Sequence, residues 1–130
     1  MKLPPYAQAL GLELEEGPEG GGAAPVLVMP FADDVVGRPG FLHGGAITGL
    51  LEVAAIAALD HALAEEGGGR IKPVNVTVEF MRGGRDKPTR ARGHVTRLGG
   101  RVGNVDAVAW QDDPARPIAR ARMNYLVVRP

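Results

Sequence analysis

Cysteine is absent from the 130-residue sequence, which excludes disulfides, thiolate zinc sites, iron–sulfur clusters and a cysteine nucleophile. Neither sign of charge is in excess: 15 Lys and Arg residues balance 15 Asp and Glu residues, whereas a dedicated nucleic-acid binder needs a basic surplus. The three histidines, at positions 43, 61 and 94, lack the spacing of metal ligands. No glycine fingerprint of a nucleotide site is present. We therefore expect no metal, no redox cofactor and no nucleic-acid partner.

The N-terminus, Met1 to Pro5, lacks the apolar stretch of a secretory signal peptide. Together with the absence of cysteine, this suits a cytoplasmic protein, which is the localisation we expect. One apolar run, Phe41 to Leu59, approaches the length of a membrane span, but it contains Glu52 and many alanines. A carboxylate inside a bilayer is costly. We therefore expect a buried helix of a soluble domain and no membrane contact.

Length and composition indicate one domain over residues 1–130, with 45% apolar and 23% charged residues. A helical pattern runs from Gly44 to Glu66 and is apolar on nearly every side. Gly67-Gly68-Gly69 is expected to end this helix, because glycine adopts the left-handed conformation that terminates helices. Two weaker strand patterns and a glycine-rich turn precede the helix: Leu12–Glu16, Ala24–Pro30 and, between them, residues 17–22.

The second half of the chain alternates between apolar and polar residues with a period of two, which is typical of strands. The expected strands cover residues 74–81, 89–98, 101–111 and 118–127, and the expected hairpin turns are Gly83–Asp86, Gly99-Gly100 and Asp112–Ala115. A long apolar helix and such a sheet pack with the sheet wrapped around the helix, an α+β fold in the order β-β-α-β-β-β-β. Because one sheet cannot cover every side of this helix, we expect at least a homodimer.

Two chemical features coincide at the expected helix start. Gly44 and Gly45 leave the first N–H groups of the helix open, and these groups favour a carbonyl oxygen or an oxyanion. Glu52 lies about 20° around and about 10 Å along the helix from Gly45. Burial of a carboxylate without a partner raises its pKa, which suits a general acid or base. The pattern predicts a substrate carbonyl at the helix start, beside Glu52.

Each of these residues also has a structural interpretation. Glu52 can pair with an arginine of a neighbouring strand, as many buried carboxylates do. His43, directly before the two glycines, can bond to the backbone of the helix start. The double glycine can mark an ordinary turn. The combination of all three at one helix start favours a functional site.

The segment His43-Gly44-Gly45, followed by Glu52, resembles the hotdog-fold acyl-CoA thioesterases, in the branch of the phenylacetate-pathway and hydroxybenzoyl-CoA thioesterases. That family carries His-Gly-Gly at the start of its central helix and an acidic residue further along it. Its order of strands and helix resembles the order expected here over residues 12–128. The resemblance implies a hotdog fold, hydrolysis of acyl-CoA to free CoA and a carboxylic acid, and a dimer or tetramer of identical chains. CoA is then part of the substrate, so no cofactor is implied.

The resemblance also implies roles for the residues of the motif. Glu52 is the catalytic carboxylate, either as general base on water or as nucleophile on the thioester carbon. The N–H of Gly44 donates to the thioester carbonyl, with Gly45 beside it in the substrate site. His43 shapes the helix start or touches the substrate.

The same resemblance implies a CoA site formed by two turns, often across a subunit interface. Arginines flank both turns here, and guanidinium groups suit phosphate, although a surface arginine alone is commonly a solvated side chain. The expected CoA-binding residues at the turns are Arg82, Arg85, Arg97, Gly99, Arg101 and Val102. Three residues near the first turn are expected to line the slot for the pantetheine arm: Asn75, Phe80 and Met81.

One position departs from the family pattern. Related enzymes carry Asn or Gln six residues before the histidine, where this chain has Gly37, so that Arg38 or a neighbour would have to compensate for the amide. Our main hypothesis is an acyl-CoA thioesterase. A hydratase or dehydratase of acyl thioesters on the same fold stays open, as does a non-catalytic acyl-CoA binding or sensing module, which Gly37 motivates. The sequence does not identify the acyl group.

Overall fold

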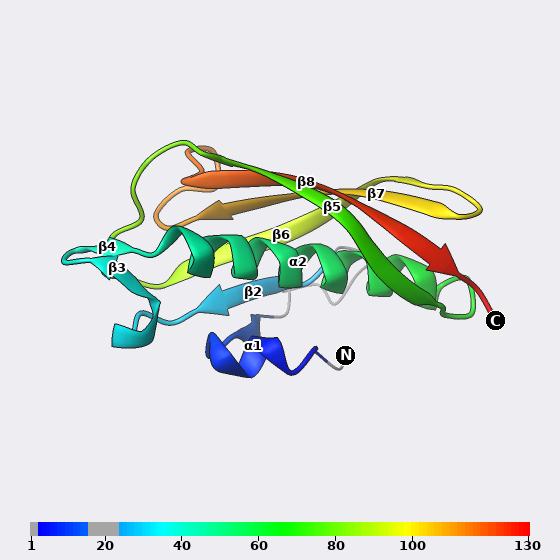
Figure 1. The fold of residues 1–130 in the computed structure, drawn as a ribbon, viewed down its shortest axis with the longest axis horizontal. Coiled ribbons are helices and arrows are strands. Elements are labelled where there is room, and N and C mark those ends of the chain that lie inside the picture. The colour runs from blue at the N-terminus through cyan, green and yellow to red at the C-terminus, as the bar shows by residue number, and fades with distance from the viewer. Residues whose placement is uncertain (1–2, 16–23) are drawn as a thin grey trace.

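The computed structural model describes residues 3–15 and 24–130, which form one long helix wrapped by a curved antiparallel sheet (Figure 1). The helix is α2, Gly44–Ala64. The strands of the sheet, in spatial order, are β1 (Glu13–Glu15), β2 (Val26–Met29), β6 (Thr89–Leu98), β7 (Val102–Trp110), β8 (Ala119–Val128) and β5 (Arg70–Phe80). The α+β class and the order of two strands, a helix and four strands are confirmed.

Short elements that the sequence pattern did not predict precede α2. They are the helix α1 (Tyr6–Ala9), the 3-10 turn η1 (Asp33–Val35) and a hairpin of β3 (Val36–Arg38) and β4 (Phe41–Leu42). The first of these packs on α2 at Gly49, where an added β-carbon would lie 2.8 Å from Cε2 of Tyr6, so that glycine allows the close approach. The described part of the first predicted strand is β1, whereas the turn predicted at residues 17–22 lies outside the described residues.

Both ends of α2 are defined by specific hydrogen bonds. At the start, the Nδ1 atom of His43 accepts the N–H of Gly45 at 2.8 Å, which caps the helix. At the end, the N–H of Gly68 donates to the carbonyl oxygen of Leu63 at 2.8 Å, and Gly67 has a φ of +93°. This is the glycine-dependent helix stop that the sequence predicted, and the helix ends at Ala64, two residues before Glu66.

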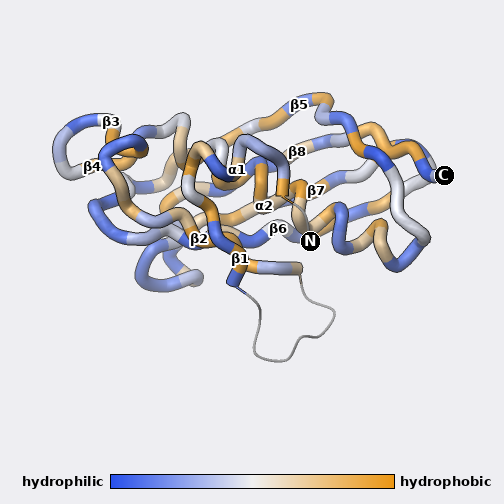
Figure 2. Tube along the Cα trace, turned by 90° about the horizontal axis from the view of Figure 1, so that it is seen from below, coloured by the Kyte–Doolittle hydropathy of each residue, from blue (hydrophilic) through white to orange (hydrophobic). Residues whose placement is uncertain are grey.

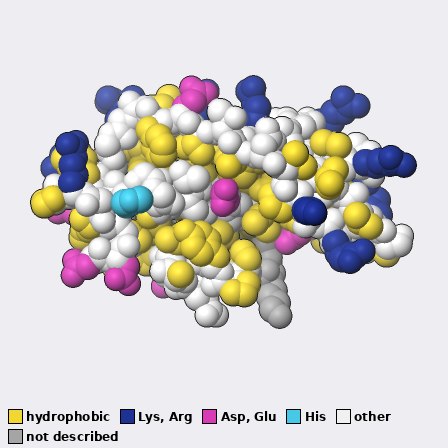
Figure 3. Space-filling model, in the orientation of Figure 1, with side chains coloured by type: hydrophobic (Ala, Val, Ile, Leu, Met, Phe, Trp, Pro, Cys, Tyr) yellow, Lys and Arg dark blue, Asp and Glu magenta, His cyan; other side chains and the backbone are white. Residues whose placement is uncertain are grey.

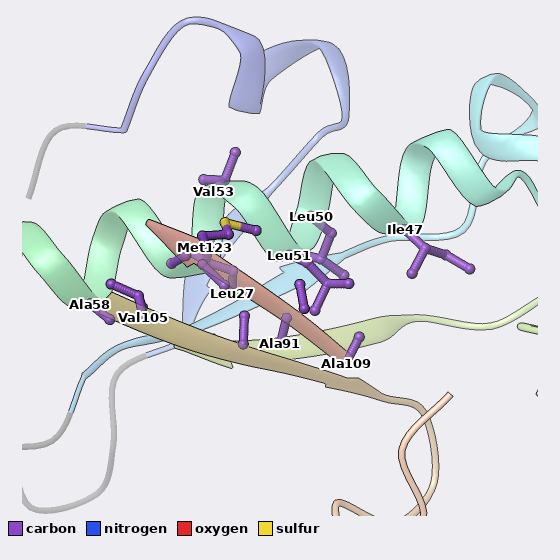
Figure 4. Close-up of a cluster of buried hydrophobic side chains, with 14 of the residues drawn as sticks. Leu27, Ile47, Leu50, Leu51, Val53, Ala58, Ala91, Val105, Ala109 and Met123 are labelled. Atoms are coloured by element: carbon purple, nitrogen blue, oxygen red, sulfur yellow. The ribbon is translucent and has the colours of Figure 1, made fainter. Parts of the chain in front are cut away.

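The core lies between α2 and the concave side of the sheet (Figure 4). Leucines and alanines of the helix face inner residues of the strands such as Leu27, Val105 and Met123. At Gly93 an added β-carbon would lie 2.6 Å from the carbonyl oxygen of Ala54, so β6 crosses the helix backbone in direct contact. The helix is long and apolar enough to cross a membrane, but 67% of its most apolar window is buried inside the chain, as expected for a core helix.

One predicted turn is wrong. Residues 83–86 do not form a hairpin, because β5 pairs with β8, whereas β6 pairs with β2 and β7. The connection from β5 to β6 instead crosses the end of the sheet. Its glycines allow close packing: a β-carbon on Gly83 would lie 2.8 Å from Phe41, and one on Gly84 would lie 2.8 Å from Leu42. The other two predicted turns do join paired strands, β6 to β7 and β7 to β8.

The strand β5 forms one border of the sheet, opposite to β1 (Figure 2). Within the described chain it has a paired neighbour on one side only, and its Pro73 lacks an N–H, which an edge strand tolerates. The predicted apolar face of this strand is largely open to solvent, with exposed fractions of 59% for Val74, 39% for Val76 and 56% for Phe80. Apolar side chains in such a row mark a surface that another molecule can cover.

Candidate active site

The helix α2 is open along one line of its surface. Gly44, Thr48, Glu52, Ile56 and Asp60 are only partly buried, and each follows the previous one by four residues. Most of the other helix positions are buried in the core. On the face shown in Figure 3, hydrophobic side chains surround an isolated acidic group in the middle of the molecule. By its spacing of eight residues from Gly44 and its partial burial, Glu52 lies on the same open line of the helix as the helix start.

The helix start offers one free N–H group. The N–H of His43 donates to the carbonyl oxygen of Val35 at 2.8 Å, that of Gly45 donates to Nδ1 of His43, and that of Ala46 donates to the carbonyl oxygen of His43 at 3.0 Å. Among the residues that the structure describes, no group accepts the N–H of Gly44. A carbonyl oxygen or an oxyanion that approaches the helix start would therefore find this donor available.

His43 has the structural role that the sequence analysis considered as one interpretation. Because its Nδ1 accepts a hydrogen bond, a neutral ring carries its proton on Nε2. The side chain is exposed beside the helix start. The cap therefore leaves the Nε2–H of a neutral His43 ring as a donor that does not bond to the helix start. Contact of this donor with a substrate stays a prediction.

The aromatic ring of Phe80 covers the helix start. A β-carbon added to Gly44 would lie 3.4 Å from Cζ of Phe80, so the ring lies in van der Waals reach of the glycine. Met81, the next residue, is 42% exposed, and its N–H donates to the carbonyl oxygen of Ile118 at 2.8 Å. Phe80 therefore lies beside the helix start, and the place of Phe80 and Met81 in a pantetheine slot stays a prediction.

Glu52 lies in a cavity and has no hydrogen-bond or ion-pair partner within the described chain. No ion pair or hydrogen bond involves its carboxylate, so the predicted alternative of a structural ion pair with arginine is not what the structure contains there. The cavity has a volume of about 330 Å³ and is mainly apolar. Its other lining residues are Ile56, Pro73, Val74, Asn75, Val76, Met123 and Tyr125. An unpaired carboxylate in an apolar cavity is available for chemistry.

Tyr125 of β8 also lines this cavity, and the sequence analysis did not single it out as a site residue. Its side chain is 2% exposed, and its hydroxyl donates to the sulfur of Met123 at 3.2 Å. Burial, and then the negative charges of Glu52 and Asp60, raise the pKa of the Tyr125 hydroxyl above its ordinary value. The phenol therefore remains a protonated donor next to the candidate carboxylate. Burial also raises the pKa of Asp60.

Asn75 borders the cavity, but its side chain is already engaged. Its Oδ1 accepts a hydrogen bond from Nδ2 of Asn124 at 2.8 Å, and Asn124 is bonded in turn to Asn104. This ladder of three amides runs across β5, β8 and β7 on the face of the sheet that points away from α2. The Oδ1 atom of Asn75 is therefore already bonded to the neighbouring strand, and a contribution of Asn75 to the slot stays a prediction.

The first predicted group of CoA-binding arginines lies at the same end of the molecule as the helix start. Arg82 donates from Nη1 to the carbonyl oxygen of Pro117 at 2.9 Å, and the guanidinium carbon of Arg85 lies 4.4 Å from the ring centroid of Phe41. Both line a cavity of about 380 Å³ together with Lys87 and Arg116 and with two acidic residues, Asp112 and Asp113, of which Asp112 pairs with Lys87 at 2.7 Å. This end of the protein therefore combines an open helix start with a group of cations.

The second predicted group of CoA-binding residues lies at the opposite end of the molecule from the helix start (Figure 1). The turn between β6 and β7 is formed and flanked by the predicted residues Arg97, Gly99, Arg101 and Val102. It lies next to the last turns of α2, because Leu59 of the helix packs on Gly103 of β7. Leu59 lies 15 residues after Gly44, which is about 22 Å along the helix, so this turn is far from the helix start. One chain alone therefore does not bring the two predicted halves of the CoA site together.

Gly37 is packed too closely to carry a side chain. A β-carbon at this position would lie 2.9 Å from Cα of His43, a distance that the rigid backbone of the helix start cannot relieve easily. The amide that related enzymes carry at this position has no room in the present backbone. Within the described residues there is also no cluster of three or more His, Asp or Glu side chains that would suit a metal ion.

The chain matches one protein family and several solved structures. The model of the thioesterase superfamily matches residues 39–118. Thioesterase HI1161 from Haemophilus influenzae is 20% identical with a TM-score of 0.82, over 95% of this chain and 82% of that chain. A phenylacetic acid degradation-related protein from Ralstonia eutropha is 23% identical with a TM-score of 0.76, over 97% and 92%. The BH2602 protein from Bacillus halodurans, solved with CoA, is 17% identical with a TM-score of 0.78, over 96% and 79%. No curated protein matches the sequence.

The family match covers more than half of the chain, so the chain belongs to the thioesterase superfamily. The three solved structures named above are less than 25% identical, and their similarity shows the fold, which is the hotdog fold that the resemblance of the His43-Gly44-Gly45 motif implied. Membership of this superfamily makes the protein a thioester hydrolase by class.

Proposed function

We propose that the protein hydrolyses acyl-CoA thioesters to free CoA and a carboxylic acid, with Glu52 as the catalytic carboxylate. One relationship carries the proposal: the unpaired Glu52 opens to the same side of α2 as the free N–H of Gly44. A thioester carbonyl that accepts this N–H is polarised, and the negative charge that develops on its oxygen is stabilised by the helix start. The Glu52 carboxylate then lies further along α2 than the reacting carbon, on the same side of the helix.

In the proposed reaction, Glu52 accepts a proton from water while the water oxygen bonds to the thioester carbon. The tetrahedral intermediate carries its negative charge on the former carbonyl oxygen, next to the N–H of Gly44. When the carbonyl re-forms, the carbon–sulfur bond breaks and the thiolate of CoA takes up the proton that Glu52 had accepted, which restores the carboxylate. Direct attack of the Glu52 carboxylate on the same carbon is the second route, through an anhydride that water then cleaves.

CoA as the thiol component is supported by charge and by comparison. Arg82 and Arg85 supply guanidinium groups at the end of the protein where the helix starts, and guanidinium groups bind phosphates with two parallel hydrogen bonds. The related BH2602 protein was solved with CoA. Phe80 and Met81 would line the pantetheine arm between these cations and Gly44.

We propose further that the active form is a homodimer that pairs through β5. The unpaired edge of this strand and the exposed Val74, Val76 and Phe80 support such an interface. Two-fold pairing of edge strands is antiparallel, so the start of one β5 lies beside the end of the other. The partner's copy of the Arg97–Val102 turn then comes toward the helix start of the first chain, which reunites the two predicted halves of the CoA site. A tetramer and a cytoplasmic location complete the proposal.

Release of free thiol from a panel of aromatic, short and medium-chain acyl-CoA substrates tests the proposal. We expect turnover with at least one member of the panel. Crotonyl-CoA is a useful member, because loss of its enoyl absorbance without free thiol would identify a hydratase instead. Tight acyl-CoA binding without thiol release from any member would identify a binding module. Either of these two results would contradict the proposed hydrolysis.

A further inference from the structure

The N-terminal helix α1 contacts the backbone of α2 at Gly49. A β-carbon added there would lie 2.8 Å from Cε2 of Tyr6, 2.9 Å from the Tyr6 hydroxyl oxygen and 2.9 Å from Cδ1 of Leu10. All three atoms belong to the ends of side chains, which can move aside for a methyl group. Glycine at position 49 therefore determines where the Tyr6 hydroxyl lies, more than whether the chain folds.

The two side chains above Gly49 differ in exposure. Leu10 packs against the core, whereas Tyr6 is 51% exposed. No hydrogen bond in the described part of the chain involves the Tyr6 hydroxyl. The protein therefore holds a half-exposed phenol against α2, and its oxygen is available both as a donor and as an acceptor.

Gly49 lies between the two parts of the candidate active site. It follows Gly45 by four residues and precedes Glu52 by three, and residues at these spacings are neighbours on a helix surface, with β-carbons about 5–6 Å apart. Together with the 2.9 Å approach at Gly49, this places the Tyr6 hydroxyl within about 9 Å of the Glu52 β-carbon. Helix side chains lean toward the N-terminus, so the Glu52 carboxylate leans toward this hydroxyl. One water molecule can bridge the remaining gap.

The attacking water needs a second partner beside Glu52. The carboxylate accepts one hydrogen of the water, and an acceptor for the other would fix the direction of the lone pair that attacks the carbon. Two further polar side chains line the cavity of Glu52, and both are engaged: Asn75 accepts a hydrogen bond from Asn124, and Tyr125 donates to the sulfur of Met123. The Tyr6 hydroxyl, by contrast, is not engaged.

We propose that the Tyr6 hydroxyl positions the water that Glu52 activates, and that Gly49 gives the phenol access to this place. The water donates one hydrogen to Glu52 and the other to the phenol oxygen. As its oxygen bonds to the thioester carbon, the first proton moves to Glu52 and later to the departing thiolate. The second hydrogen stays on the oxygen, which becomes the hydroxyl of the product acid, so Tyr6 neither gains nor loses a proton. The inference rests on the proposed acyl-CoA hydrolysis.

Tyr6→Phe removes the hydroxyl and keeps the ring on Gly49. With the acyl-CoA that the panel shows to be turned over fastest, we expect kcat to fall by roughly tenfold to a hundredfold, because a water held by one partner is poorly aligned. KM should stay within threefold, as should the calorimetric affinity for an S-alkyl-CoA thioether, which cannot be hydrolysed. Thr77→Val, which removes an exposed hydroxyl of β5, is the control and should retain wild-type kcat.

Gly49→Ala tests the same hydroxyl without removing it. The added methyl group displaces the end of Tyr6, so kcat should fall into the same range. In the Tyr6→Phe background the same substitution should lower kcat by less than threefold, since no hydroxyl is left to displace. If thermal unfolding shows that Gly49→Ala is unfolded at the assay temperature, Tyr6→Phe alone decides the inference, because its ring packing is retained.

The combination of Tyr6→Phe with Glu52→Gln separates positioning of the water from a general effect on structure. Two groups that act on one water lose their effects together, so the double variant should have a kcat within threefold of Glu52→Gln alone. Losses that multiply would overturn the inference. Wild-type kcat in Tyr6→Phe, or a change confined to KM, would overturn it as well.

The inference and the proposed function can fail separately. If the wild-type protein releases no thiol from any acyl-CoA, the proposed function and the role of Tyr6 are both wrong. If the wild-type protein hydrolyses an acyl-CoA and Tyr6→Phe does so equally fast, the proposed function stands and only the role of Tyr6 is overturned.

Discussion

Tyr125 of β8 and Glu52 of α2 line the same cavity, and the carboxylate acts on the phenol through its charge. Burial, Glu52 and Asp60 all raise the pKa of the Tyr125 hydroxyl. In the unfolded chain the same group titrates near 10.0. Because the folded-state pKa of Tyr125 is higher than this value, the group does not affect stability below pH 10.0, and stability decreases as the pH rises above 10.0.

Tyr125→Phe should therefore remove part of the alkaline loss of stability. At pH 7 the substitution should cost no more than about 1 kcal/mol, because the hydroxyl has only a thioether as acceptor. Chemical denaturation of the two proteins between pH 7 and pH 11 measures this difference. Parallel stability curves for wild type and variant over that range would contradict the expected coupling.

Asp60→Asn should stabilise the protein at neutral pH. Burial raises the pKa of Asp60 above its ordinary value of 3.8, so the folded state disfavours the charged form. The penalty is absent at low pH, where the carboxyl is protonated in both states, and develops as the pH rises through the folded-state pKa. Thermal unfolding should show a higher Tm for the variant at pH 7 and no gain near pH 3. A variant with lower Tm at pH 7 would contradict this account.

Gly37→Ala should destabilise the helix start. The added β-carbon would lie 2.9 Å from Cα of His43, and relief requires a shift of the backbone that caps α2. We expect a loss of about 1–3 kcal/mol in the free energy of unfolding, measured with denaturant. Gly100→Ala is the control, since nothing lies within 4 Å of a β-carbon there. Equal stability of the two variants would show that the helix start tolerates a side chain at position 37.

Val76→Lys should dissociate the proposed dimer. Val76 is 39% exposed on the inner face of the edge strand β5, and two copies of a charged side chain at a two-fold interface repel each other. Analytical ultracentrifugation should show a dimer or larger assembly for wild type and a monomer for the variant. Val128→Lys, at an exposed valine of β8, should leave the assembly intact. A monomeric wild type would contradict the interface.

Periodicity along the chain was sufficient for the parts of the fold that depend on local patterns. The spacing of Glu52 from Gly45 predicts the side of the helix on which Glu52 lies, and Gly67 predicts where the helix ends, because both follow from helix geometry alone. The pairing of β5 with β8 could not be predicted from periodicity. Glycines near a strand end look the same whether they form a tight turn or, like Gly84, pack against Leu42 beneath a crossing connection.

The candidate site was predictable to the same extent. The helix start and Glu52 lie within nine residues of sequence, so local geometry brings them to one side. The Tyr125 hydroxyl beside Glu52 depends on long-range packing, as does the distance between Arg82 and Arg101. Asn75 was expected in the slot, but its amide is bonded to Asn124 of the neighbouring strand, a partner that only the register of β5 with β8 defines.

The most direct test of the account is the turnover of Glu52→Gln compared with its affinity for substrate. The variant keeps the size of the side chain but cannot accept a proton or attack a carbonyl carbon. With the best acyl-CoA of the panel, we predict a loss of kcat of about a hundredfold or more, with acyl-CoA binding within threefold of wild type. Glu79→Gln, at an exposed carboxylate of β5, is the control and should retain full activity. Wild-type kcat in Glu52→Gln would contradict the central claim that this carboxylate performs the hydrolysis.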